Sequence, residues 1–70
     1  MNILETAKKA IKLSKELDRT IYMYHWHGEY SVSIQYWNDW IFKVYPGGRR
    51  VLSIGGRELA KKEGVEKAFE

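Results

Sequence analysis

Residues 20–45 dominate what this 70-residue chain can fold into, because they hold nine of its ten aromatic residues, both histidines and all three tryptophans. Aromatic and β-branched residues favour strands, and turn signals divide this run at His27-Gly28-Glu29, Asn38-Asp39 and Pro46-Gly47. The flanking segments are rich in lysine and glutamate and show helical spacing. The sequence therefore predicts an α+β fold with an N-terminal helix, an antiparallel meander of three to four strands and a C-terminal helix.

The first helix is predicted to run from Asn2 to about Leu17, with Asn2 as N-cap and Glu5 completing a capping box. A second helix is expected after Gly55-Gly56. Gly64 either lies inside that helix at an energetic cost or ends it as the C′ residue. Both helices are expected to cover one face of the sheet. The residues expected to face the core from the first helix are Ile3, Leu4, Ala7, Ala10, Ile11, Ser14 and Leu17.

The direction of each strand side chain follows from the alternation along a strand. A two-residue first turn, at His27-Gly28 or Gly28-Glu29, places Tyr22, Tyr24 and Trp26 on the side away from the helices. A three-residue turn would place them inside, and a two-residue turn at Asn38-Asp39 would invert the third strand. With the first choice and a three-residue loop at 37–39, the core side holds Ile21, Met23, His25, His27, Tyr30, Val32, Ile34, Tyr36, Trp40, Phe42 and Val44.

The last turn is expected at Pro46-Gly47, as the centre of a type II turn in which glycine takes the positive φ. A short fourth strand would then follow over residues 51–54. The expected outer side of the sheet carries Tyr22, Tyr24, Trp26, Ser31, Ser33, Gln35, Ile41, Lys43 and Tyr45.

Length and composition narrow the classes of protein. Seventy residues make one domain, over residues 1–70, and a thin core for which large rings can compensate. The chain has no cysteine, so disulfides and thiolate metal sites are excluded. It contains no apolar run of membrane-spanning length and no apolar signal region near its N-terminus. We expect a complete, soluble, cytoplasmic protein that needs no cofactor.

Two short resemblances concern nucleic acids. The segment LAKKEGV, residues 59–65, resembles the first helix and turn of helix-turn-helix proteins, but the six residues after Gly64 are too few for a reading helix. The element order resembles that of the double-stranded RNA-binding domain, which implies lysine contacts to phosphate. This chain has Arg57-Glu58 where that domain has paired lysines, and residues 46–54 add a strand. The residues that carry the second resemblance are Ala60, Lys61, Gly64, Val65, Ala68 and Phe69.

Catalytic and metal sites are not predicted. His25 and His27 share a strand face, but only Glu29 is close enough in sequence to add a third metal ligand. Ser31 and Ser33 lack a nucleophile elbow or a carboxylate pair. We therefore expect a protein that is not an enzyme.

The favoured hypothesis is a small binding module that docks on a protein through an aromatic sheet face. It would act as an adaptor or an occupancy-type inhibitor, phage accessory proteins being one such setting. Homo-oligomerisation through the same aromatic face is a further hypothesis. The predicted contact residues are Tyr22, Tyr24, Trp26, Lys43, Tyr45, Arg49 and Arg50. The alternative is binding of RNA or DNA through basic helix flanks, formed by Lys8, Lys12, Lys15, Arg19, Arg57, Lys61 and Lys62.

Overall fold

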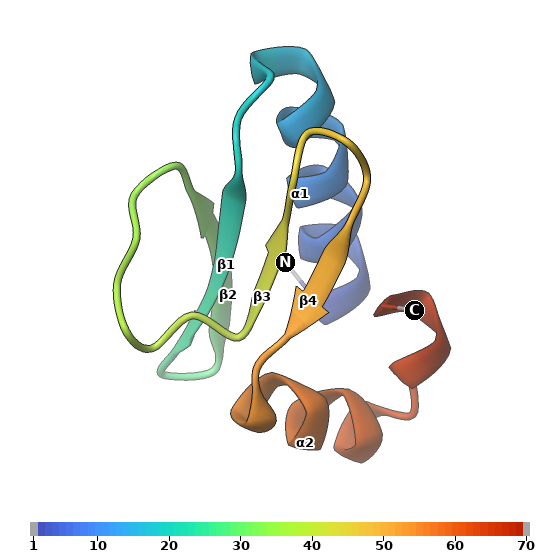
Figure 1. The fold of residues 1–70 in the computed structure, drawn as a ribbon. Coiled ribbons are helices and arrows are strands. Elements are labelled where there is room, and N and C mark those ends of the chain that lie inside the picture. Colours follow the sequence, from blue (N-terminus) through green and yellow to red (C-terminus); the bar gives the residue numbers. More distant parts are fainter. Residues whose placement is uncertain (1, 70) are drawn as a thin grey trace.

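The computed structural model of the chain describes residues 2–69. It confirms the predicted fold class: an N-terminal helix, one antiparallel sheet and a C-terminal helix, with the helices packed against the sheet (Figure 1). The elements are α1 (Ile3–Leu17), β1 (Ile21–Trp26), β2 (Glu29–Ser33), β3 (Phe42–Val44), β4 (Arg50–Leu52), α2 (Ile54–Glu63) and a final 3₁₀ helix η1 (Glu66–Phe69).

Helix α1 begins as its sequence predicts. The Asn2 side chain accepts a hydrogen bond from the Glu5 amide at 2.8 Å, which satisfies one of the free amides of the first turn. The helix ends at Asp18, whose φ of 52° is left-handed. Its buried side consists of Ile3, Thr6, Ala7, Ala10 and Ser14, so small residues bring the helix close to the sheet.

Strands β1 and β2 form the predicted hairpin. His27 and Gly28 both have positive φ, 49° and 78°, as a two-residue type I′ turn requires. This turn pairs Met23 with Val32 and Tyr24 with Ser31. The two-residue turn is therefore confirmed at His27-Gly28, and it fixes which side of β1 and β2 meets α1.

The third strand departs from a meander, because β3 pairs with β1 and not with β2. The order across the sheet is β2-β1-β3-β4. Since β2 and β3 are both antiparallel to β1, they run parallel to each other, and a tight turn cannot join parallel strands. Residues 34–41, here called the crossover loop, therefore pass over β1 on the face opposite α1 (Figure 1).

The turn before β4 also corrects the prediction, because Gly48 rather than Gly47 has the positive φ, at 97°. The Gly48 amide donates to the Tyr45 carbonyl at 2.9 Å, and the Tyr45 amide donates to the Arg49 carbonyl at 2.8 Å. Pro46 and Gly47 thus form the centre of the turn, and Gly48 follows as the left-handed residue of a three-residue hairpin loop. The strand ends at Leu52, earlier than expected.

Helix α2 starts before the predicted Gly55-Gly56 boundary. Ser53 is its N-cap and accepts a hydrogen bond from the Gly56 amide at 2.9 Å. Gly64 ends the helix with φ of 70°, so of the two roles expected for it the C′ role is the one observed. The 3₁₀ helix η1 follows, and its Phe69 ring packs edge-on against Phe42 with centroids 4.9 Å apart. The main core lies between the inner face of the sheet, α1 and η1.

Candidate functional site

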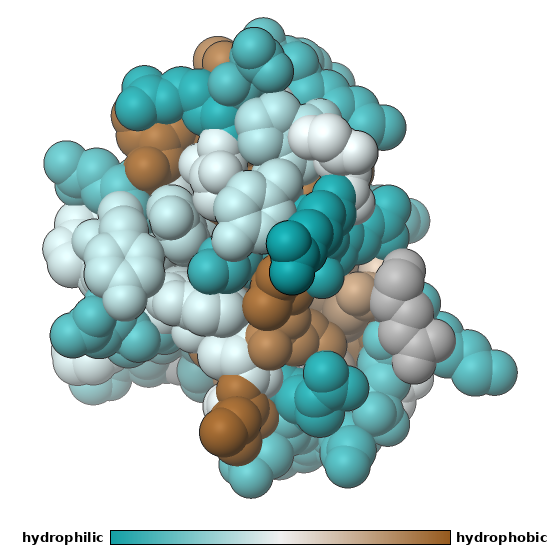
Figure 2. All heavy atoms as spheres, in the orientation of Figure 1, coloured by the Kyte–Doolittle hydropathy of each residue, from teal (hydrophilic) through white to brown (hydrophobic). Residues whose placement is uncertain are grey.

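The sheet face opposite α1, here called the outer face, carries most of the residues predicted to bind a partner. Cross-strand pairing places Tyr22 beside Lys43 and Ser33, and Tyr24 beside Ser31. Their facing is the one that the alternation predicted. Figure 2 shows side chains in the pale shades that include tyrosine and tryptophan gathered on the visible face, next to small apolar patches. The rings therefore lie on the outer face and not beneath the helices.

Tyr24 corrects the prediction of a contact residue, because its side chain is only 7% exposed. Its hydroxyl donates to the Gln35 carbonyl at 2.7 Å and accepts from the Trp37 amide at 2.7 Å. Alternation along β1 gave the correct facing but could not show that the crossover loop covers the ring. Tyr24 therefore fixes the loop to the sheet, and a partner has little access to it.

The crossover loop adds two exposed rings that the sequence prediction missed. Tyr36 is 58% exposed and Trp37 is 50% exposed. Tyr36, which was expected to face the core, instead packs edge-on against Tyr22 with centroids 5.6 Å apart. Trp37 packs in the same way against Tyr24 at 5.2 Å. The prediction continued the strand alternation of β2 as far as Tyr36. In the structure β2 ends at Ser33, and the chain then leaves the sheet.

Trp26 is the most exposed ring, at 70%, and lies at the end of the first hairpin. A hollow of about 460 Å³ opens on this part of the outer face. The residues that line it are Tyr24, Trp26, Ser31, Ser33, Trp37 and Asp39. Strands β1 and β2 thus form one part of the hollow, and the crossover loop forms the rest.

A row of cations and rings occupies the β3 side of the outer face. Lys43 Nζ lies 4.6 Å from the centroid of the Trp40 ring and 5.7 Å from that of Tyr45. The Arg49 guanidinium carbon lies 5.8 Å from the Tyr45 centroid. Three predicted contact residues, Lys43, Tyr45 and Arg49, are therefore brought together, and Trp40 joins them.

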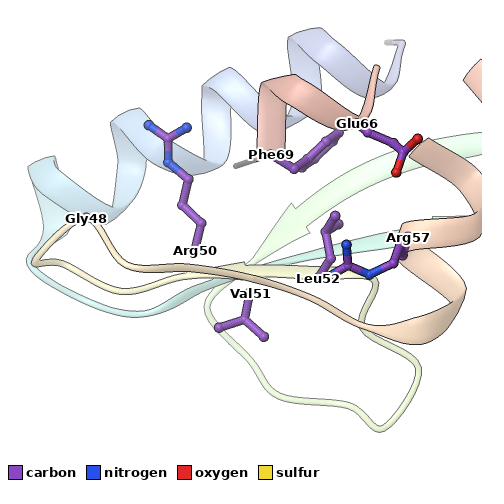
Figure 3. Close-up of a pocket in the computed structure, with 7 residues that line it drawn as sticks. All are labelled: Gly48, Arg50, Val51, Leu52, Arg57, Glu66 and Phe69. Carbon is purple, nitrogen blue, oxygen red and sulfur yellow. The ribbon is translucent and has the colours of Figure 1, made fainter. Parts of the chain in front are cut away.

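Arg50 is not part of the outer face, which corrects its predicted position at the rim. Arg50 pairs with Val44, whose side chain is in the core, so it points to the α1 side of the sheet. It lines a second cavity of about 560 Å³ together with Arg57, Glu66, Phe69 and neighbouring β4 residues (Figure 3). The extra turn residue Gly48 was not foreseen, so the facing of β4 could not be assigned from the sequence.

The basic residues of the alternative site are exposed but lie on two separate helical regions. Those of the N-terminal region are Lys8, Lys12, Lys15 and Arg19, and those on α2 are Arg57, Lys61 and Lys62. Lys12 also forms an ion pair with Glu16 at 3.8 Å. Residues 46–54, where this chain was expected to add a strand to the layout of the double-stranded RNA-binding domain, do contain the extra strand β4.

Within residues 2–69, no group of three or more histidine or acidic side chains is arranged to hold a metal ion. His25 is half-buried and packs on the Tyr30 ring, with centroids 4.6 Å apart, while His27 belongs to the turn. Over the same residues, no helix combines the length and apolarity needed to cross a membrane.

No protein-family model, curated protein or solved structure matches this chain. Its function must be inferred from its own side chains.

Proposed function

We propose that this protein is a non-enzymatic module that docks on another protein through the outer face. The contact surface would be centred on Trp26, Tyr36 and Trp37, with Tyr22 beside them. Lys43, Tyr45 and Arg49 would form its polar edge. A module of this kind acts as an adaptor or inhibits its target by occupying the target's surface.

One observation carries the proposal: three large rings are exposed on one face of a very small domain. Among residues 2–69 there are six exposed large apolar side chains, and Trp26, Tyr36 and Trp37 are three of them. Tryptophan and tyrosine are enriched at the energetic centres of protein interfaces. An apolar surface that is exposed to solvent in the monomer is typical of an interaction site.

Charge supports a protein partner over a nucleic acid. Binding of single-stranded nucleic acid combines stacking rings with a positively charged groove. On the outer face, Lys43 and Arg49 already lie over rings, and Asp39 adds a negative charge. Rings with a mixed polar edge match the composition of protein interfaces better.

The partner can be identified by site-specific photo-crosslinking in cells that naturally contain the protein. One variant carries the crosslinker in place of Tyr36, and a matched control carries it in place of Ile54. Ile54 is suitable because it is 83% exposed on α2. A protein captured only from Tyr36 is then purified, and its affinity for the unmodified chain is measured.

The decisive measurement compares two double variants. Trp26→Ser with Tyr36→Ser should weaken binding by about thirtyfold or more, because interface hot spots are worth roughly 2 kcal/mol or more. Leu17→Ser with Ile54→Ser removes exposed apolar side chains elsewhere and should leave affinity nearly unchanged. Equal binding by wild type and the first double variant would refute the proposal. Concentration-dependent dimerisation that the first variant abolishes would replace it by self-association.

Nucleic-acid binding remains the second proposal, supported by the exposed cations of α1 and α2. It predicts an affinity that falls steeply with salt, because each neutralised phosphate releases counterions. Joint substitution of Lys8 and Lys15 by glutamine should weaken such binding at every sequence tested. Absence of binding to RNA and DNA at low salt would eliminate it.

A further inference from the structure

The hollow on the outer face has a chemical character that differs from that of the whole chain. The chain carries a net charge of +3, yet the six residues that line the hollow include one carboxylate, Asp39, and no basic side chain. Three of the six are aromatic, namely Tyr24, Trp26 and Trp37. A negative group is therefore combined with ring surfaces in a predominantly basic protein.

The rings of the hollow are held by packing on one another. Tyr24 and Trp37 meet edge to face, with their planes at 71° and their centroids 5.2 Å apart, so neither ring stacks on the other. Tyr24 is 7% exposed and its hydroxyl is occupied by backbone groups of Gln35 and Trp37, so it forms the floor of the hollow, and the exposed rings are those of Trp26 and Trp37. Aromatic faces carry partial negative charge and attract cations, tryptophan most strongly.

Asp39 contributes the negative charge of the hollow. Burial raises the pKa of the Tyr24 hydroxyl, and the charge of Asp39 acts in the same direction. The position of the carboxylate comes from the lining of the hollow, to which Asp39 and Tyr24 both belong. A carboxylate beside two exposed rings complements a cation whose surroundings are apolar.

We propose that this hollow binds an alkylated ammonium group, such as a methylated lysine side chain or a choline-like headgroup. Alkyl groups on the nitrogen match the ring surfaces and reduce hydration, while the positive charge is complemented by Asp39 and the ring faces. Ser31 and Ser33 add hydroxyl groups at the strand side. The inference rests on the proposed function in one respect, since it names the chemical group of a partner that the outer face would recognise.

The test compares choline with its uncharged carbon isostere, 3,3-dimethylbutan-1-ol, by NMR of the three tryptophan indole N–H signals. Choline should shift the signals of Trp26 and Trp37 in a saturable way. Trp40 is an internal control, because its ring lies against Lys43 and not in the hollow. The affinity of the isostere should be at least about fivefold lower than that of choline, since the isostere lacks the charge. Equal affinity, or no saturable shift with choline, would overturn the proposal.

Two variants separate the charge from the general surface. Asp39→Asn should reduce choline affinity by about threefold or more, and Trp37→Leu should reduce it further. Glu58→Gln removes an exposed carboxylate from α2 and should have no effect. Because Trp37 is half-exposed and Asp39 is exposed, unfolding curves should verify that both variants remain folded. Unchanged affinity in Asp39→Asn would contradict the assigned role of the carboxylate.

A trimethyllysine peptide and free choline distinguish the two sources of the group. The trimethyllysine peptide is compared with choline and with the same peptide carrying unmethylated lysine. If the trimethyllysine peptide binds more tightly than both, the ammonium group belongs to a protein side chain. Equal affinities of choline and the trimethyllysine peptide would assign it to a small molecule. These titrations use no natural partner. Ammonium binding can therefore fail while protein docking through Trp26 and Tyr36 is observed, and docking can fail while ammonium binding is observed.

Discussion

The hydroxyl oxygen of Tyr24 lies 2.7 Å from the backbone nitrogen of Trp37 and accepts its hydrogen bond. The same hydroxyl donates to the Gln35 carbonyl, also at 2.7 Å. A side chain on β1 thereby holds two backbone positions of the crossover loop, Gln35 and Trp37. The exposure of Tyr36 and Trp37 on the outer face depends on this attachment.

Removing the hydroxyl should loosen the loop and destabilise the protein. In Tyr24→Phe, the Trp37 amide and the Gln35 carbonyl both lose their partner, which should lower the free energy of unfolding by about 1–3 kcal/mol. Amide hydrogen exchange at Trp37 should become faster than in wild type. Tyr22→Phe is the matched control, since the Tyr22 hydroxyl has no hydrogen-bond partner within residues 2–69 and its loss should change stability by under about 0.5 kcal/mol. Equal denaturation curves for the two variants would show that the attachment is unimportant.

The start of α2 should tolerate no side chain at position 56. A Cβ atom on Gly56 would overlap the Ile41 carbonyl, which also accepts a hydrogen bond from the Ser53 amide. Gly56→Ala should therefore cost at least about 2 kcal/mol in urea denaturation, because backbone must move. Gly55→Ala, next to it in the same helix and facing open space, should stabilise by about 0.5–1 kcal/mol. A Gly56→Ala midpoint equal to that of wild type would disprove the close approach.

In the turn before β4, alanine substitutions at the two neighbouring glycines should have different effects on stability. Gly48→Ala should cost about 1 kcal/mol, because a Cβ is strained at a φ of 97°. Gly47→Ala should change stability by less than about 0.5 kcal/mol, since its φ is not positive and nothing blocks the added methyl group. The reverse order of the two effects in thermal or urea unfolding would indicate a type II turn.

Alkaline pH should destabilise the fold in part through two tyrosines. Burial raises the pKa of Tyr24 above its ordinary value of 10.0, and burial followed by the charge of Glu63 raises that of Tyr30. A raised pKa means that the folded state holds the proton more tightly than the unfolded state. This contribution is complete below the unfolded pKa and is lost as pH rises through the folded one. Urea midpoints from about pH 9 to about pH 11 should fall more steeply for wild type than for Tyr24→Phe. Parallel pH profiles would contradict the shift at Tyr24.

Local signals in the sequence predicted part of the fold. Asn2 marks a helix start by its side-chain chemistry, whereas two roles were open for Gly64, and the structure shows the helix end. A two-residue first turn was favoured over a three-residue one, and the structure shows it at His27-Gly28, where it sets the register of the hairpin. The outward facing of Tyr22, Tyr24 and Trp26 follows from that register.

The partner of the third strand could not be predicted in this way. Phe42 and Val44 alternate correctly for a buried strand whether β3 lies beside β1 or β2, so the local pattern does not distinguish the two pairings. The crossover loop is a consequence of that choice. Without it, neither the burial of Tyr24 nor the exposure of Tyr36 could be deduced.

The attachment of the crossover loop also bears on how fast and how tightly a partner can bind. A free loop would lose conformational entropy when a partner immobilised it, and that loss would weaken the complex. Here the entropy is already given up during folding, through the bonds of the Tyr24 hydroxyl. Trp37 and Tyr36 are thus preorganised for rigid-body association, and a partner can meet them without first selecting one conformation from many.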